Sequence, residues 1–155
     1  MRLIPWACVA ASLAGCGYSV GGLIEHESVF VEFFGNDDER RTHEFELTRA
    51  VNRELQARGV RVNDAAAPVL LKGKILEITE PSVVEGQSDE TIVGSVSFRI
   101  EVALVSRSTG RQISKRVVDE SATFSTIRLQ NRDTARRRVI DSLARRVATF
   151  LEKDF

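Results

Sequence analysis

Few residue types in this chain are suited to catalysis. The 155 residues include two histidines, His26 and His43, and two cysteines, Cys8 and Cys16. His26 has no second histidine at metalloprotease-helix spacing, and His43 falls at an expected helix start, where polar residues are common. The sequence contains no GxGxxG or GxxxxGK motif, so phosphate-loop chemistry has no support. The string Gly17-Tyr18-Ser19-Val20-Gly21 has the form GxSxG, but it lies in a glycine-rich N-terminal segment rather than between a predicted strand and a helix, as a hydrolase would require. We therefore predict that the protein is not an enzyme and holds no metal or cofactor.

The chemistry that the sequence does support is acylation of Cys16. An apolar run from Leu3 to Ala14 follows the basic start; it is shorter than the roughly 20 residues that cross a bilayer and is typical of a secretory signal. The run ends in Leu13-Ala14-Gly15-Cys16, which resembles the lipobox of bacterial lipoproteins. The resemblance implies a diacylglyceryl group on the Cys16 thiol and cleavage just before that residue. Residues 1–15 are thus a predicted signal peptide.

The same segment indicates where the protein resides. Cys8 would be removed with the signal, leaving Cys16 as the one cysteine of the mature chain, its sulfur capped by lipid. An Asp after the cysteine would suggest inner-membrane retention by the enterobacterial sorting rule, but the residue there is Gly17. We therefore expect a lipid-anchored protein on the periplasmic side of the outer membrane, which contacts the membrane through its N-terminal lipid.

Length and charge favour one domain without a nucleic-acid partner. Lys plus Arg number 22 and Asp plus Glu number 22, whereas proteins that bind phosphate backbones are usually clearly basic. A chain of 155 residues, 43% of them hydrophobic, suffices for one core and is short for two domains. We expect residues 16–27 to be a lipidated N-terminus and tether, and residues 28–155 to form a single domain.

Apolar periodicity predicts the elements of that domain. Alternating residues predict a strand at 29–34 that is buried largely on both faces, and turn residues follow it at 35–38. A strict period of two predicts a strand at 91–106 with one face on the core, and the turn residues at 107–110 make 111–124 its partner strand. A β-rich run, with a bulge at Gly73, predicts a fourth strand at 69–80. A period near 3.6 predicts helices at residues 42–58 and 131–155. The order β-α-β-β-β-α fits an α/β (α+β) two-layer sandwich, a mixed sheet of about four strands with both helices on one face.

Two surface segments are candidates for binding. Arginines gather in the second helix, where Arg138 and Arg145 are seven residues apart and are expected, with Arg146, to lie near one another on the exposed flank. They form either a solvated helix face or a contact for a lipid phosphate or an acidic partner. Residues 80–90 separate two strands and are either a mobile hairpin loop or a recognition tip formed by Val83 and Val84.

The mature chain as a whole resembles the LptE family of lipopolysaccharide-assembly lipoproteins, from Cys16 to about Leu151. The resemblance rests on the order of several short pieces rather than on one motif. These pieces are Cys16-Gly17-Tyr18, Val29 to Phe34 with Asn36, Leu47-Thr48-Arg49-Ala50, Arg58-Gly59, Leu71-Lys72-Gly73 and Thr109-Gly110.

The resemblance implies a function without catalysis. In that family the lipoprotein helps the outer-membrane barrel LptD to fold and plugs it, with lipopolysaccharide as the passing ligand. It therefore implies LptD and lipopolysaccharide as partners, and Lys72, Lys74 and Arg99 are candidate lipopolysaccharide contacts by position alone. A periplasm-facing envelope lipoprotein that acts as adaptor or activator of a cell-wall synthesis enzyme is the alternative.

The lipobox predicts that Cys16→Ala leaves the chain unprocessed, because the Cys16 sulfur is the atom that accepts the diacylglyceryl group. Labelled palmitate fed to cells that express the variant should not be incorporated, and the precursor should keep its full mass. Cys8→Ala is the matched control and should be lipidated and cleaved normally. Palmitate on the Cys16→Ala chain would contradict the lipobox.

Overall fold

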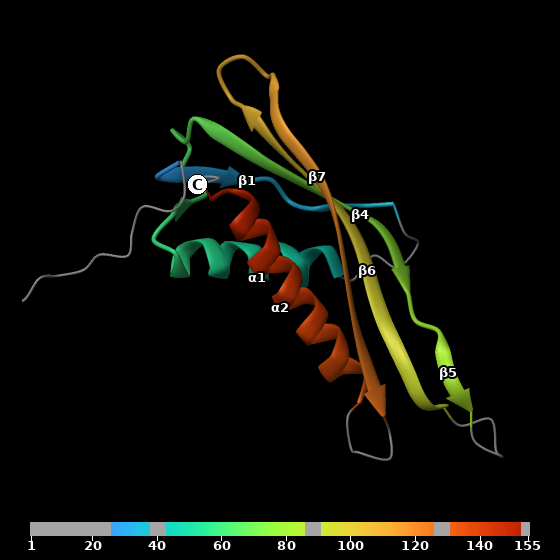
Figure 1. Ribbon diagram of the computed structural model, residues 1–155. Coiled ribbons are helices and arrows are strands. Elements are labelled where there is room, and N and C mark those ends of the chain that lie inside the picture. The colour runs from blue at the N-terminus through green and yellow to red at the C-terminus, as the bar shows by residue number, and fades with distance from the viewer. Residues whose placement is uncertain (1–25, 38–42, 86–90, 126–130, 153–155) are drawn as a thin grey trace, which may run out of the picture.

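The computed structural model describes residues 26–37, 43–85, 91–125 and 131–152. A curved sheet forms one layer and two helices, α1 and α2, form the other (Figure 1). The elements in chain order are β1 Ser28–Val31, β2 Gly35–Asn36, α1 His43–Ala57, β3 Arg61–Val62, β4 Val69–Thr79, β5 Ser82–Glu85, β6 Thr91–Ser106, β7 Gln112–Ser125 and α2 Arg132–Phe150.

The sheet is mixed. Its main order is β3-β1-β4-β6-β5, with β2 also paired to β4 and β7 paired to β6. β1 and β2 run parallel to β4, whereas β4, β5 and β7 all run antiparallel to β6. The long β6 therefore links the parallel part of the sheet to the β6–β7 hairpin.

Strand β6 has the strict alternation that its sequence predicts. Five of its side chains point to the helices and are at most 5% exposed, namely Val96, Phe98, Ile100, Val102 and Leu104. The alternate residues Ser97, Arg99 and Glu101 point to the opposite, outer face, where they are exposed or half-buried. One face of the sheet therefore covers the core, and the other is open to contacts outside the domain.

The two helices complete a core built from residues between Val29 and Leu151. Leu47, Val51 and Leu55 of α1 are fully buried, as the helical period predicts. Thr48 connects α1 to the segment between β1 and β2, because its Oγ1 accepts a hydrogen bond from the Phe34 amide at 3.1 Å. The Asn131 side chain caps the start of α2 by accepting a hydrogen bond from the Thr134 amide at 2.8 Å.

The predicted fold class is confirmed, but the sheet has more than the four predicted strands. All four predicted strands are present, and the short strands β2, β3 and β5 join them. β2 lies where the sequence predicts a turn, and β5 occupies part of the predicted loop at residues 80–90. A strand of two residues is too short to show a period of its own, so only pairing with a neighbour reveals it.

The predicted role of Gly73 is wrong, and the predicted extent of the first strand is too long. Gly73 does not mark the bulge, because the shift in register between β4 and β6 lies between Ile75 and Glu77. Gly73 instead makes room for the Phe34 ring, whose nearest carbon would lie 2.1 Å from a Cβ at that position. The first strand is largely buried on both faces, as predicted, but it ends at Val31 rather than at residue 34, and Phe33 beyond its end is 57% exposed.

His43, in the first turn of α1, is the most unusual polar group in the core. Its ring contacts Phe98 edge to face, with centroids 5.5 Å apart, and its Nδ1 has no hydrogen-bond partner in the described part of the chain. Burial, and secondarily the charge of Arg136, lower the pKa of His43. The ring is therefore neutral in the folded domain at pH 7.

The alternation of β6 predicts unequal effects of two adjacent substitutions. Phe98→Ala removes a ring that is 1% exposed and should lower the free energy of unfolding by about 3–5 kcal/mol. Ser97→Ala, on the outer face, should change that free energy by at most about 0.5 kcal/mol. Urea unfolding of both variants measures the difference, and equal losses would contradict the assignment of faces.

The buried His43 ring predicts a loss of stability on mild acidification. Because its folded pKa lies below the unfolded value, the unfolded chain takes up the proton first as the pH falls through about 6.5. This group should reduce stability by at most about 1.4 kcal/mol per pH unit below that point. His43→Phe should flatten the unfolding free energy between pH 7.5 and 5.5, and an unchanged slope in the variant would refute the assignment.

Candidate functional site

The three cations proposed from sequence as ligand contacts share one surface, the outer face of the sheet. Lys72 and Lys74 lie on β4, and Arg99 lies on β6 opposite Glu77 of β4. All three are about half exposed. The strand register therefore brings together residues that are up to 27 positions apart in sequence.

Each of these cations already has a carboxylate partner. Lys72 Nζ lies 3.5 Å from Glu32, and Lys74 Nζ lies 2.5 Å from Asp37. A third lysine of this face, Lys115 on β7, pairs with Glu101 at 2.8 Å. The centre of the outer face is consequently a network of ion pairs rather than a basic patch with free cations.

Arg99 is held most closely. Its Nε donates a hydrogen bond of 2.6 Å to Asp119 on β7, and its Nη1 lies 3.4 Å from Glu77 on β4. The hydrogen bond to Asp119 is the main cause of a raised pKa for Arg99, so the guanidinium stays charged. Arg99 thereby links three adjacent strands across the outer face.

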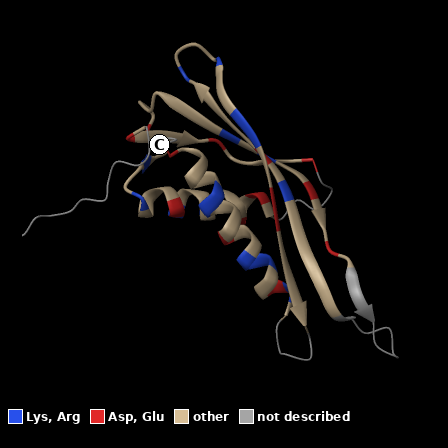
Figure 2. Ribbon diagram, viewed as in Figure 1, with Lys and Arg blue, Asp and Glu red and all other residues tan. Residues whose placement is uncertain are grey.

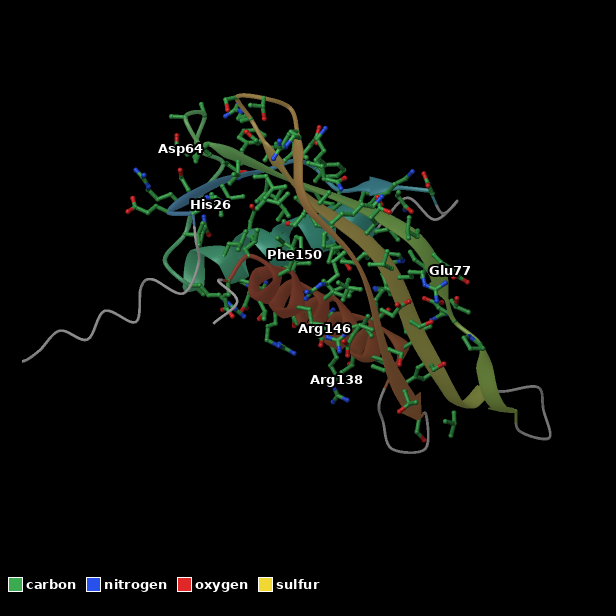
Figure 3. The ribbon with its side chains drawn as sticks, turned by 45° about the horizontal axis from the view of Figure 1, so that its top comes forward. His26, Asp64, Glu77, Arg138, Arg146 and Phe150 are labelled. Atoms are coloured by element: carbon green, nitrogen blue, oxygen red, sulfur yellow. The ribbon has the colours of Figure 1, made fainter. Side chains whose placement is uncertain are left out.

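A shallow polar hollow of about 480 Å³ adjoins this bridge. Its lining includes Arg99, Asp119 and Glu77, and Arg146 reaches it from α2. Arg146 Nη1 donates to the Asp119 carbonyl at 2.9 Å, and its Nε lies 3.2 Å from Glu120. Figure 3 labels Arg146 and Glu77, which come from the two layers of the domain. The hollow is lined by donors and acceptors suited to a polar partner.

Next to these ion pairs, the outer face carries side-chain hydroxyl groups. The ladder aligns Thr79, Ser97 and Ser121 in one row across three strands, and Ser95 opposite Thr123 in the next. These hydroxyls can donate and accept hydrogen bonds at once. This part of the face is suited to hydrogen bonding with a polar surface.

The arginines of α2 separate into paired and unpaired groups. Arg132 pairs with Glu80 at 3.3 Å, and Arg136 pairs with Asp133 at 3.1 Å. Arg138 and Arg145, the two predicted contacts, are exposed and have no carboxylate partner within the described residues. Figure 3 shows Arg138 extending away from the sheet. The predicted exposed flank therefore exists, but on the helix layer, away from Lys72, Lys74 and Arg99.

Val83 and Val84 do not form a loop tip. Both belong to β5, in which Val84 pairs with Val93 of β6. The remainder of the predicted loop, residues 86–90, lies outside the described residues. Backbone pairing of this kind has no distinct signal in a four-residue segment that follows a proline.

The structure adds Asp119, Ser121 and Arg146 to the candidate site. The sequence places Asp119 and Ser121 on a strand, but it does not give the register of that strand against β6. It therefore cannot show which residues of β6 lie opposite them. The alternation of Ser95, Ser97 and Arg99 was the available signal, since it predicts one polar face.

Metal and membrane features were also sought within the described segments. No group of three His, Cys, Asp or Glu side chains there could hold a metal ion. None of the helices described is long and apolar enough to cross a membrane.

Several solved structures share the fold of this chain at low sequence identity. Protein XCC0632 from Xanthomonas campestris is similar with a TM-score of 0.64 and 9% identity, over 85% of this chain and 87% of that one. The PelC dodecamer from Paraburkholderia phytofirmans gives a TM-score of 0.60 and 18% identity, over 87% and 92%. A minor lipoprotein from Acinetobacter baumannii gives 0.55 and 14%, over 83% and 92%.

A match to a protein-family model, rather than the similarity of fold, shows the family of this chain. A search of curated proteins found no match. The family model LptE, described as lipopolysaccharide-assembly, matches residues 27–151. That range includes every strand and helix of the structure, from β1 to the end of α2. The chain therefore belongs to the LptE family of lipopolysaccharide-assembly proteins.

Proposed function

We propose that this protein is an outer-membrane lipoprotein that assists assembly of the LptD barrel and plugs it, so that lipopolysaccharide can pass to the cell surface. Membership of a lipopolysaccharide-assembly family over residues 27–151 supports the general role. The observation that carries the specific proposal is the outer face of the sheet, which is wide, polar and free of any covering element of the described chain.

The chemistry of that face suits the inside of a barrel. The interior of a large outer-membrane barrel is polar. A plug must therefore present paired charges and hydroxyls, because an unpaired charge enclosed there loses hydration without compensation. The Arg99 bridge and the hydroxyl row at Thr79, Ser97 and Ser121 meet this requirement.

The exposed arginines of α2 suit a contact with the phosphates of lipopolysaccharide better than the cations of the outer face do. Lys72, Lys74 and Arg99 would have to give up their carboxylate partners to bind an anion. Arg138 and Arg145 are exposed without such partners in the described structure, and a guanidinium binds phosphate in a bidentate manner. We therefore assign the proposed lipopolysaccharide contact to α2. β5, a terminal strand of the main sheet order that contains Val83 and Val84, remains a proposed barrel contact.

Purification of the full-length lipoprotein from its own membranes tests the partner. An affinity-tagged chain should retain LptD in equal amount, together with lipopolysaccharide, after mild detergent extraction. Mass spectrometry identifies the partner, and gel staining gives the stoichiometry. A peptidoglycan enzyme in place of LptD would favour the adaptor role and contradict the proposal.

A double substitution on the outer face tests whether this face contacts the barrel. Thr79→Arg with Ser121→Arg adds two uncompensated cations there and should reduce the co-purified barrel at least tenfold. Gln56→Arg with Ala57→Arg adds the same charge at exposed positions of α1 and should retain the barrel. Exposed substitutions change stability by about 0.5 kcal/mol or less, so the melting temperatures should remain close. Equal recovery from both variants would exclude the outer face as the barrel contact.

A further inference from the structure

The end of the β6–β7 hairpin carries cations without acidic residues among them. No Asp or Glu occurs from residue 102 to residue 118. Four cations lie there, and we call them, together with Ile113, the basic hairpin end: Arg107, Arg111, Lys115 and Arg116. Figure 2 shows Lys and Arg but no Asp or Glu along the turn and its adjoining strand ends.

Most of these cations have no carboxylate to neutralise them. Lys115 pairs with Glu101. Arg107 lies 5.0 Å above the Phe30 ring, and Arg116 lies 5.5 Å above the Phe150 ring. Arg107, Arg111 and Arg116 are all exposed, and none forms an ion pair within the described residues. The aromatic contacts orient two guanidinium groups but leave their charge uncompensated.

An apolar side chain accompanies the cations. Ile113 has no Cα partner in β6, because Leu104 pairs with Ser114 and Val105 pairs with Gln112. This bulge leaves Ile113 52% exposed. Ile113 also lines a hollow of about 320 Å³ with Arg116 and Phe150. The basic hairpin end is therefore amphipathic, like segments that lie in the interface of a membrane.

The basic hairpin end lies where the chain enters the fold. Val29 of β1 pairs with Val69 of β4, and Val69 pairs with Ser106 just before the turn. The Arg107 amide donates to the Pro68 carbonyl at 2.9 Å. His26 lines the same hollow as Ile113. One carboxylate, Asp64, also lies at this end (Figure 3), where its Oδ1 accepts a hydrogen bond from the Ala66 amide and pairs with none of the four cations.

The length of the tether fixes how far this end can be from the membrane. Residues 16–27 number twelve and span at most about 40 Å when fully extended. If Cys16 is acylated, the entry point of the domain stays within that distance of the bilayer. The basic hairpin end lies beside this entry point and is then within reach of the lipid headgroups.

We propose that the basic hairpin end docks on the anionic phospholipid headgroups of the membrane in which the lipid anchor lies. The guanidinium groups of Arg107, Arg111 and Arg116 bind lipid phosphates, and Ile113 enters the headgroup layer. The inference rests on the proposed lipid anchor. Docking would fix the orientation of the domain and leave the outer face of the sheet free for a protein partner.

Binding to vesicles tests this docking without any barrel or lipopolysaccharide. The chain from residue 16 with Cys16→Ser carries no acyl group and keeps every described residue and the whole core. It should bind vesicles of phosphatidylcholine with 30% phosphatidylglycerol, and lose that binding between 50 and 500 mM salt. It should not bind vesicles of phosphatidylcholine alone. Sedimentation of the vesicles gives the partition coefficient.

Matched variants locate the surface. Each cation near an anionic membrane contributes about fivefold to partitioning, so Arg111→Glu with Arg116→Glu should reduce the partition coefficient by about 25-fold or more. Arg49→Glu with Arg137→Glu makes the same charge change at exposed positions of the two helices and should bind nearly as the parent does. Circular dichroism should show both variants folded.

Several outcomes would overturn the proposal. Equal losses from the two variants would show that net charge, rather than the hairpin, governs binding. Absence of binding to the phosphatidylglycerol vesicles, with binding to purified lipopolysaccharide instead, would assign these cations to that ligand. Because the assay contains only the chain and lipids, its failure is distinguishable from a failure to co-purify LptD.

Discussion

The one-sided burial of β6 is the constraint on which the rest of the structure depends. Its inward side chains fill the core between sheet and helices, and its backbone pairs with β4, β5 and β7. A shift of one residue in register would expose Phe98 and bury Arg99. The helices must therefore lie on one face, and the polar residues of three strands must align on the other. The candidate site is a consequence of this alignment.

Much of the fold could be predicted because its long elements carry strong periods. The alternation from Val96 to Leu104 and the helical spacing of Leu47, Val51 and Leu55 correctly predict which faces are buried. The short strands could not be predicted, since β2 and β3 have two residues each and depend on the edge that a neighbour offers. The role of Gly73 also depends on a neighbour that the local sequence does not reveal. Its role is set by Phe34, a residue 39 positions earlier in the chain.

The candidate site was less predictable than the fold for a related reason. The sequence identifies cations but not their partners, and partners decide what a cation can do. Lys72, Lys74 and Arg99 are candidate contacts by position alone, and the structure places the carboxylates of Glu32, Asp37, Glu77 and Asp119 beside them. Arg146 was grouped with Arg138 and Arg145, yet it contacts the backbone of β7. Only the three-dimensional contacts distinguish a cation that already has a partner from one that has none.

The separation of paired and unpaired cations also explains how a nearly neutral chain can have distinct surfaces. With 22 basic and 22 acidic residues, it has no net field to attract an anionic ligand from a distance. Charge on the outer face is compensated within about 4 Å, which permits close approach to a polar wall at a small cost in hydration. Within the described residues, no carboxylate pairs with Arg107, Arg111 or Arg116 near the β6–β7 turn or with Arg138 or Arg145 on α2, so these guanidinium groups suit phosphates better. The arrangement of acids, rather than the number of bases, therefore determines which surface suits a protein and which suits a lipid.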